Sequence, residues 1–244
     1  MLSSILSLRG ISKAFGAVVV ADGLNLELAP GEALGMLGPN GAGKTSLFGI
    51  ISGALAPNAG EVSFDGKDIT KLPPPARCRL GIARSYQIPQ PFGDMTVFEN
   101  LAVAAAFAKG RRETEVYHQC AAILIDCGLA DKANRRASSL TLLDRKRLEL
   151  ARALATEPKL LLLDEVAGGL SESECDQLVE LIKRIRQEKG VSMIWIEHIV
   201  HALVAVVDRV VVLSGGTFIA DGKPSEVVVH PKVVEIYMGI SADD

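Results

Sequence analysis

Apolar and polar positions alternate along the N-terminal part of the chain in a way typical of β-strands. Residues 4–35 contain two such runs, around "ILSLRGISKAF" and "GLNLELAPGEALGMLG", with a Pro-Gly turn at 30–31. "EVSFDGKDI" repeats the alternation, and its Asp65-Gly66 pair predicts a tight hairpin. This part of the chain is therefore predicted to be rich in β-strands.

A different pattern follows, first helical and then mixed. Prolines cluster in "KLPPPARCRLGIARSYQIPQPFGDMT", and residues 97–154 are predicted to be almost wholly helical, as an inserted helical lobe. From residue 159 onward, the short apolar runs "KLLLLDE", "VSMIWIEH" and "RVVVLSGG" alternate with the helical stretch "SECDQLVELIKRIRQEKG". Apolar strands separated by helices predict a parallel sheet that is buried on both faces, and hence an α/β fold.

Composition narrows the classes of function. The chain has 244 residues, 48% of them apolar, with a formal net charge of -3, which argues against a general nucleic-acid binder. Its longest apolar runs fall well short of the roughly 18 residues that cross a bilayer. "MLSSILSLRG" has neither a basic segment nor a clear cleavage site, so no export signal is expected.

The segment "GPNGAGKT", Gly38 to Thr45, lies between a predicted strand and a predicted helix. Glycines at this spacing let the backbone wrap phosphate groups at a helix N-terminus. Lys44 is expected to reach the β- and γ-phosphates and the Thr45 hydroxyl to bind Mg²⁺. The alternative is a glycine-rich turn with a solvated lysine. The predicted nucleotide-binding residues here are Gly38, Asn40, Gly41, Ala42, Gly43, Lys44, Thr45 and Ser46.

The apolar strand "LLLLDE" ends in two acids. A strand buried on both faces delivers its last residues to the carboxyl edge of the sheet, where a phosphate loop also lies. Asp164 is expected to hold Mg²⁺, and Glu165 to polarise the water that attacks the γ-phosphate. The alternative is a strand followed by ordinary acidic loop residues.

"GPNGAGKTSLFGIISG", "RLELARALATEPKLLLLDE" and "IWIEH" together resemble the ATPase subunit of an ABC transporter over essentially the whole chain. "GIARSYQIPQPFGDMTVFENL" and "SGGTFIADGKPSEVVVHPKVVEIYMG" are similar to the branched-chain amino-acid importer group, in particular the longer of its two ATPase subunits. Urea-type importers share this pattern.

The resemblance implies one ABC ATPase domain over residues 1–244. Residues 1–88 and 155–244 would form a P-loop NTPase core with an antiparallel β-lobe, and residues 89–154 the α-helical lobe. It also implies that ATP is sandwiched between two such chains.

The resemblance assigns further roles by position. Phe15 matches the aromatic residue that stacks on adenine. The alternative is that Phe15 is a core residue of its strand. Gln87 matches a glutamine that contacts Mg²⁺ or its water, and His198 matches a histidine near the γ-phosphate. We therefore expect Gln87, Glu165 and His198 to be catalytic, and Thr45, Gln87 and Asp164 to ligate the metal.

The family signature, usually Leu-Ser-Gly-Gly-Gln, falls at residues 140–144. Thr141 keeps the hydroxyl that would reach the partner's nucleotide, whereas Leu143 replaces a glycine and Asp144 a neutral amide. Thr141-x-x-Asp144 also fits a capping-box pattern, in which the hydroxyl bonds a free N–H of the helix, and both interpretations stay open. The following Arg145, Lys146 and Arg147 are expected to form a solvated helix face. Ser171 stands where the family usually has Asp or Asn.

By this resemblance the chain is predicted to be the energy-coupling subunit of an importer for branched-chain or other hydrophobic amino acids, or for urea-type solutes. Its partners would be separate transmembrane permease subunits, a second ATPase subunit that is the same or different, and an external solute-binding protein, with no nucleic acid. It would lie in the cytoplasm, on the inner face of the cell membrane. The alternatives are an ABC ATPase without a transport role and a nucleotide-sensing regulatory module.

Overall fold

The computed structural model describes residues 4–238, so the first residues of the N-terminal segment and Gly239, at the end of the tail motif, lie outside it. The chain forms two compact units, residues 1–74 with 192–244, and residues 75–191. The predicted division into core and helical lobe after residues 88 and 154 stays a prediction. No helix within residues 4–238 is long and apolar enough to cross a membrane.

The first unit contains two sheets and the helices that flank them. Its elements are β1 (Leu6–Phe15), β2 (Val18–Leu28), β3 (Ala33–Leu37), α1 (Lys44–Ser52), β4 (Ala59–Phe64), β5 (Lys67–Asp68), β8 (Ser192–Ile196), α7 (Val200–Val204), β9 (Arg209–Ser214), β10 (Thr217–Gly222), α8 (Pro224–Val227) and α9 (Pro231–Met238).

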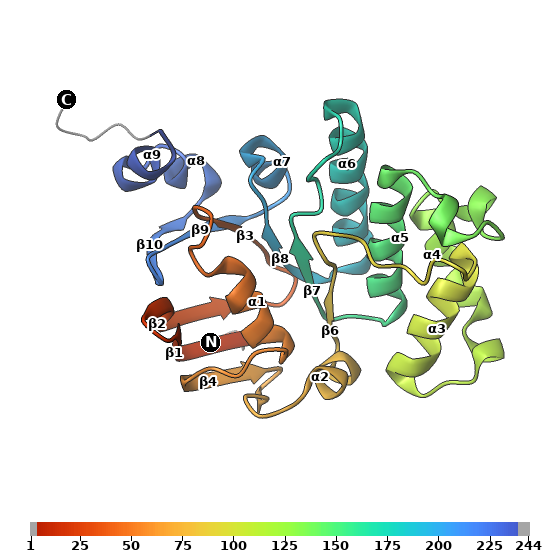
Figure 1. Ribbon diagram of the computed structural model, residues 1–244, viewed down its shortest axis with the longest axis horizontal. Coiled ribbons are helices and arrows are strands. Elements are labelled where there is room, and N and C mark those ends of the chain that lie inside the picture. The colour runs from red at the N-terminus through yellow and green to blue at the C-terminus, as the bar shows by residue number, and fades with distance from the viewer. Residues whose placement is uncertain (1–3, 239–244) are drawn as a thin grey trace. The chain divides into compact units, whose positions relative to one another are not determined.

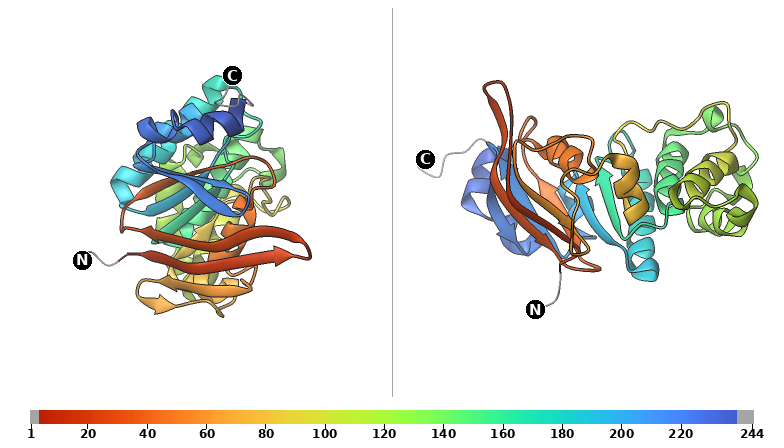
Figure 2. Two further views of the ribbon diagram at one scale, coloured as in Figure 1. Left: turned by 90° about the vertical axis from the view of Figure 1, so that its left-hand side faces the viewer. Right: turned by 90° about the horizontal axis from the view of Figure 1, so that it is seen from below.

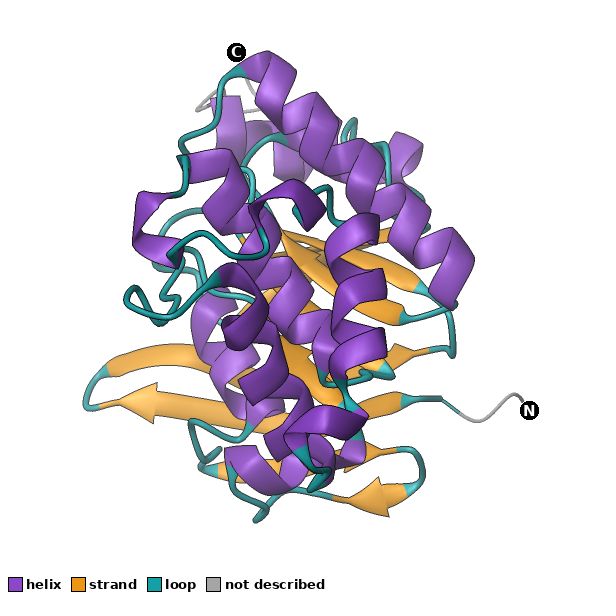
Figure 3. Ribbon diagram, turned by 90° about the vertical axis from the view of Figure 1, so that its right-hand side faces the viewer, coloured by secondary structure: helices purple, strands orange, loops and turns teal. Residues whose placement is uncertain are grey.

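An antiparallel sheet in the order β2-β1-β4-β5 forms the predicted β-rich region (Figure 2). Leu6 and Leu8 of β1 stand opposite Leu28 and Leu26 of β2, all of them buried. Figure 3 shows this hairpin as two long strands joined at a short turn. The predicted hairpin between β4 and β5 is present, with φ of 50° and 74° at Asp65 and Gly66, as a type I′ turn requires.

The other sheet of this unit has the order β10-β9-β3-β8. β3 pairs in parallel with both β8 and β9, whereas β10 pairs antiparallel with β9. Every residue of β3 and β8 is buried, which confirms the expectation of a parallel sheet covered on both faces.

The second unit combines a parallel strand pair with helices. Its elements are α2 (Pro74–Leu80), β6 (Ile82–Arg84), α3 (Val97–Lys109), α4 (Tyr117–Asp126), α5 (Leu142–Ala155), β7 (Leu160–Asp164), α6 (Glu172–Lys189) and three short 3₁₀ helices at 113–115, 130–132 and 137–139. Helices α3, α4 and α5 pack against one another (Figure 1).

The helical stretch predicted over 97–154 is interrupted more than the sequence indicated. Helix α3 ends at Gly110 with φ of 64°, and Gly128, with φ of 68°, follows α4. Residues 127–141 contain only two short 3₁₀ helices. Glycines in the left-handed region end helices at little cost, and this accounts for the breaks.

Candidate functional site

The loop between β3 and α1 follows a tight path that depends on two glycines. Gly38 and Gly43 have φ of 155° and 103°. A Cβ on Gly38 would lie 2.2 Å from the carbonyl oxygen of Leu213, and one on Gly43 would lie 2.2 Å from that of Val20. Any side chain at either position would therefore push the loop away from the neighbouring strands.

Lys44 directs its ammonium group into this loop. The side chain is buried, and Nζ donates hydrogen bonds to the carbonyl oxygens of Gly38 at 2.6 Å and Pro39 at 3.1 Å. Helix α1 begins at Lys44, and the exposed residues around this point are Asn40, Gly41 and Thr45. A helix N-terminus, a cation and glycine-rich backbone come together here, which is the combination that binds phosphate groups.

His198 leaves the sheet at the same edge as this loop. β3 and β8 are parallel neighbours with Met36 opposite Ile196, so the residues that follow the two strands emerge side by side. His198 is exposed, whereas the preceding Glu197 is buried and accepts a hydrogen bond from the His198 amide at 3.0 Å. By this register, His198 emerges from the sheet beside the start of the phosphate loop, and its role at the γ-phosphate stays a prediction.

Phe15 ends β1, and its ring is available to a ligand. The residue is 49% exposed, which excludes the alternative that it is a core residue of the strand. The Lys13 ammonium lies 5.2 Å from the ring centroid, within cation–π range. An exposed aromatic face of this kind can stack on a planar base.

In the second unit, the predicted metal ligand Asp164 has a cation beside it. β6 and β7 are parallel, with Arg84 opposite Leu162, so both strands end at one edge. Asp164 ends β7 and is buried, and Arg84 Nη2 lies 2.7 Å from its Oδ2. The Asp164 amide also donates to Ser85 Oγ at 3.4 Å. This carboxylate is therefore held in an ion pair with Arg84.

Gln87 and Glu165 meet side chain to side chain. The Gln87 Nε2 group donates a hydrogen bond to Glu165 Oε2. Glu165 adopts φ of 47°, in the left-handed region that few residues other than glycine occupy. Two residues that were predicted separately, 78 positions apart in the chain, thus form one pair.

Comparisons with known proteins identify the family. A model described as "ABC transporter" matches residues 21–168. This chain belongs to the ABC transporter family. It is 35% identical to the high-affinity branched-chain amino acid transport ATP-binding proteins LivG of Escherichia coli (strain K12) and BraF of Pseudomonas aeruginosa, with 98% of this chain and 99% of each relative covered.

The fold comparison agrees with the sequence comparison. The crystal structure of an ATP-binding cassette of an ABC transporter, in its ADP conformation, matches with a TM-score of 0.89 and 31% identity, covering 97% of this chain and 99% of that chain. A nucleotide-free ATP-binding cassette matches with a TM-score of 0.86, also at 31% identity, covering 97% of this chain and 100% of that chain. The P-loop NTPase fold is confirmed, and the chain is an ABC ATPase, which binds and hydrolyses ATP.

The signature segment of this ABC ATPase is tied into helix α5. Thr141 is the N-cap residue of α5, and its Oγ1 accepts a hydrogen bond from the Asp144 amide at 3.3 Å, as the capping interpretation predicts. The Asp144 carboxylate is buried and accepts from Lys132 Nζ at 2.7 Å. The negative charge that replaces a neutral amide is therefore neutralised within this unit.

The prediction of a solvated basic face at residues 145–147 holds for Arg145, which is exposed, but is wrong for the buried Lys146, and Arg147 is half-buried. Arg145 Nε donates to the Leu140 carbonyl oxygen at 3.0 Å, and Arg147 Nη2 donates to Gln177 Oε1 at 3.0 Å. Lys146 is only 4% exposed, and its Nζ donates to the main-chain carbonyl oxygens of Gln87 at 2.7 Å and Glu165 at 3.3 Å. Neighbouring elements therefore cover the face of α5 that carries Lys146, whose ammonium group serves internal carbonyl oxygens.

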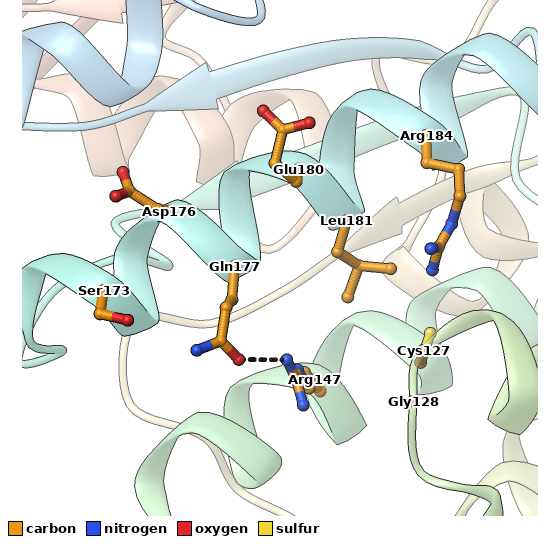
Figure 4. Close-up of a pocket in the computed structure, with 9 residues that line it drawn as sticks. All are labelled: Cys127, Gly128, Arg147, Ser173, Asp176, Gln177, Glu180, Leu181 and Arg184. Carbon is orange, nitrogen blue, oxygen red and sulfur yellow. Dashed lines mark hydrogen bonds between the residues drawn. The ribbon is translucent and has the colours of Figure 1, made fainter.

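Arg147 also lines a cavity of about 510 Å³ along helix α6 (Figure 4). The lining residues are Cys127, Gly128, Arg147, Ser173, Asp176, Gln177, Glu180, Leu181 and Arg184. Because this set includes none of the predicted site residues, the cavity is separate from the candidate site of the ABC ATPase.

Sequence reasoning missed Arg84 and Lys146. Arg84 is the last residue of a short strand three positions before Gln87, and a cation at a strand end is an ambiguous signal. Lys146 offers a clearer one, because it follows Leu143 by three positions and precedes Leu150 by four, on the apolar stripe of α5. A lysine on an apolar stripe indicates a buried cation that needs acceptors.

Proposed function

We propose that this chain is the energy-coupling ATPase of an importer for branched-chain or other hydrophobic amino acids. The observation that carries the proposal is the 35% identity, over 98% of the chain, to LivG and BraF, whose names assign them to branched-chain amino acid transport. Urea-type solutes are the second candidate cargo. The ATPase activity itself follows from family membership.

The residues at the two sheet edges fit Mg-ATP chemically. We assign phosphate binding to the loop from Gly38 to Ser46, with Lys44 as its cation, and adenine stacking to Phe15. Thr45, Gln87 and Asp164 offer a hydroxyl, an amide and a carboxylate, which are oxygen ligands of the kind Mg²⁺ prefers. When bound, Mg²⁺ neutralises charge on the β- and γ-phosphates.

For hydrolysis we assign Glu165 to take a proton from the attacking water, which its carboxylate does when it turns from the Gln87 amide toward the nucleotide. His198 is an exposed hydrogen-bond partner for the γ-phosphate. Thr141 is assigned to the nucleotide of a partner ATPase. Its hydroxyl oxygen caps α5, which leaves the hydroxyl hydrogen to donate.

The signature supports unequal sites if the partner is a different ATPase subunit. Leu143 cannot give the close backbone approach of a glycine, and Asp144 is turned inward to Lys132. The site completed by this signature is therefore the weaker one. The site with Lys44, Asp164 and Glu165 of this chain, completed by the partner's signature, is the competent one. The test is to inactivate the catalytic glutamate of each subunit in turn and measure ATP hydrolysis at the remaining site. Equal rates at the two sites contradict unequal sites.

The partners that the proposal requires are transmembrane permease subunits, a second ATPase subunit and an external solute-binding protein, with the ATPase on the inner face of the membrane. The test is to tag the full chain in its native host, purify it from membranes with its bound partners, and reconstitute the complex in vesicles. ATP-dependent uptake of labelled leucine supports the proposal. Uptake of labelled urea alone identifies urea-type solutes as the cargo instead. Recovery of the tagged chain only from the supernatant, with no uptake, contradicts the transport role.

Pairing is tested separately with purified Glu165→Gln by size exclusion with light scattering. Blocked hydrolysis traps an ATP-bound dimer if the chain pairs with itself. A dimer that appears only with Mg-ATP supports a homodimer. A monomer that nevertheless binds ATP supports a different partner subunit.

A further inference from the structure

Lys146 carries a charge in the interior of the second unit. The side chain lies in the second turn of α5 and is 4% exposed. Removing an ammonium group from water is costly unless its N–H groups find acceptors. Two of those acceptors are the main-chain carbonyl oxygens of Gln87 and Glu165, at 2.7 Å and 3.3 Å.

The two carbonyl groups belong to the same pair of residues whose side chains meet. Gln87 follows β6, Glu165 follows β7, and the Gln87 amide donates to the Glu165 carboxylate. Lys146 therefore holds the main chain of both residues from the side of α5. Three segments far apart in the sequence converge on one ammonium group.

Glu165 is the residue that most needs such a restraint. Its φ of 47° is unfavourable for a residue with a side chain and persists only where neighbouring groups hold it. A hydrogen bond to its carbonyl oxygen fixes the peptide plane that follows Glu165. The direction in which the carboxylate projects is thereby restricted.

We infer that Lys146 is a positioning residue for ATP hydrolysis, holding the main chain of Gln87 and Glu165 so that the Glu165 carboxylate is aligned with the attacking water. The inference rests on the proposed role of Glu165 as the general base. Lys146 acts through Glu165 and has no assigned contact with the nucleotide. Because Lys146 lies five residues after Thr141, it also links the signature segment to the general base.

The test compares full-length Lys146→Met, which keeps the volume but removes the charge and the donors, with Lys146→Arg, which keeps both. Lys183→Met is the matched control, because Lys183 lies on α6 in the same unit and pairs only with the exposed Glu180 among the interactions described. Single-turnover hydrolysis of labelled ATP and binding of a non-hydrolysable ATP analogue are measured for each. The same substitutions are made in Glu165→Gln.

Lys146→Met is expected to lower the hydrolysis rate by about 100-fold, the loss typical of a misplaced catalytic group. Its affinity for the analogue should change by less than about threefold, because Lys146 is not expected to affect binding of the nucleotide in its ground state. Lys146→Arg should restore most of the rate, and Lys183→Met should leave it unchanged. In Glu165→Gln, adding Lys146→Met should lower the residual rate by less than about twofold, since the two residues act as one unit.

A Lys146→Met protein that hydrolyses ATP at the normal rate, while Glu165→Gln does not, overturns the inference and leaves the proposed function intact. Equal losses of rate and affinity without rescue by arginine also overturn it, because they indicate a merely structural role. If Glu165→Gln keeps the normal rate, the proposed general base is wrong and the inference is overturned with it. Should Lys146→Met not fold, Lys146→Leu, which also lacks donors, replaces it, and a normal rate there overturns the inference.

Discussion

The guanidinium of Arg84 lies 2.7 Å from the carboxylate of Asp164, with side-chain exposures of 13% and 4%. The acid assigned to Mg²⁺ is thus paired with a largely covered cation from the neighbouring strand. A carboxylate in this setting needs a positive charge beside it, whether an arginine or a metal ion. We therefore predict that Arg84 supports Asp164 when no metal is bound and shares the carboxylate with Mg²⁺ when the metal is bound.

This pairing predicts a nucleotide-dependent effect of Arg84→Met. Without nucleotide, the variant should lose about 3 kcal/mol of stability, because a buried carboxylate is left without its partner. With saturating Mg-ATP the loss should be smaller, since the metal supplies the missing charge. Urea unfolding without nucleotide and with saturating Mg-ATP measures both values, and ATP plus a chelator shows whether the metal is required.

Arg111→Met is the control for that experiment. Arg111 pairs with Glu157 in an ion pair whose side chains are 39% and 41% exposed, so its removal should cost less than about 1 kcal/mol under either condition. A loss in Arg84→Met that is the same with and without Mg-ATP contradicts the assignment of Asp164 to the metal.

Lys44→Ala is expected to weaken ATP binding by about 10- to 100-fold, the equivalent of one lost charge-assisted hydrogen bond. The ammonium group is already held at the centre of the phosphate loop by the carbonyl oxygens of Gly38 and Pro39. Titration with a fluorescent ATP analogue measures the dissociation constant. Lys67→Ala, an exposed lysine of β5 in the same unit, should bind normally, and normal binding by Lys44→Ala contradicts the assignment.

Thr141→Ala should lower the free energy of unfolding by about 1 kcal/mol, because the N-cap of α5 loses its acceptor. Thr141→Ser keeps the hydroxyl and should retain most of the stability. If the hydroxyl also serves a partner's nucleotide, Thr141→Ala but not Thr141→Ser should prevent ATP-dependent pairing of Glu165→Gln. Thermal unfolding and light scattering separate the two roles, and normal pairing by Thr141→Ala limits the hydroxyl to capping.

Ser171, which departs from the family pattern, is explained by the helix that it begins. It is the N-cap of α6 in a reciprocal capping box with Glu174, and hydrogen bonds from the backbone and side chain of Ser171 lower the pKa of the Glu174 carboxyl. The ionised form is therefore favoured in the folded state. Its contribution to stability is present above the ordinary pKa of 4.5 and is lost as pH falls through the lowered value.

The stability difference between the wild-type chain and Glu174→Gln should accordingly shrink as the pH is lowered from 6 toward about 3. Thermal unfolding over this range measures the difference. In a Ser171→Ala background the pH-dependent part should become smaller but persist, because the side-chain hydrogen bond is lost while the backbone N–H of residue 171 still donates to the Glu174 carboxylate. A difference that stays constant with pH contradicts this account.

The sequence by itself determined the features that follow local rules. "GPNGAGKT" predicts the phosphate loop because only glycines allow the backbone of Gly38 and Gly43 to pass so close to neighbouring strands. "LLLLDE" predicts a buried strand that carries Asp164 to a sheet edge. Asp65-Gly66 predicts the hairpin between β4 and β5. Each depends on a residue type and its immediate neighbours.

The tertiary structure alone decided which acceptors the lysine and arginine side chains bind. A run such as Arg145, Lys146 and Arg147 has the same composition whether it faces water or protein, and long side chains reach acceptors far away in the sequence. The fold covers α5 and brings the carbonyl groups of Gln87 and Glu165 to Lys146. It likewise sets Arg84 beside Asp164, and Lys132 beside Asp144, because burial of each carboxylate requires a counter-charge that only the packed chain supplies.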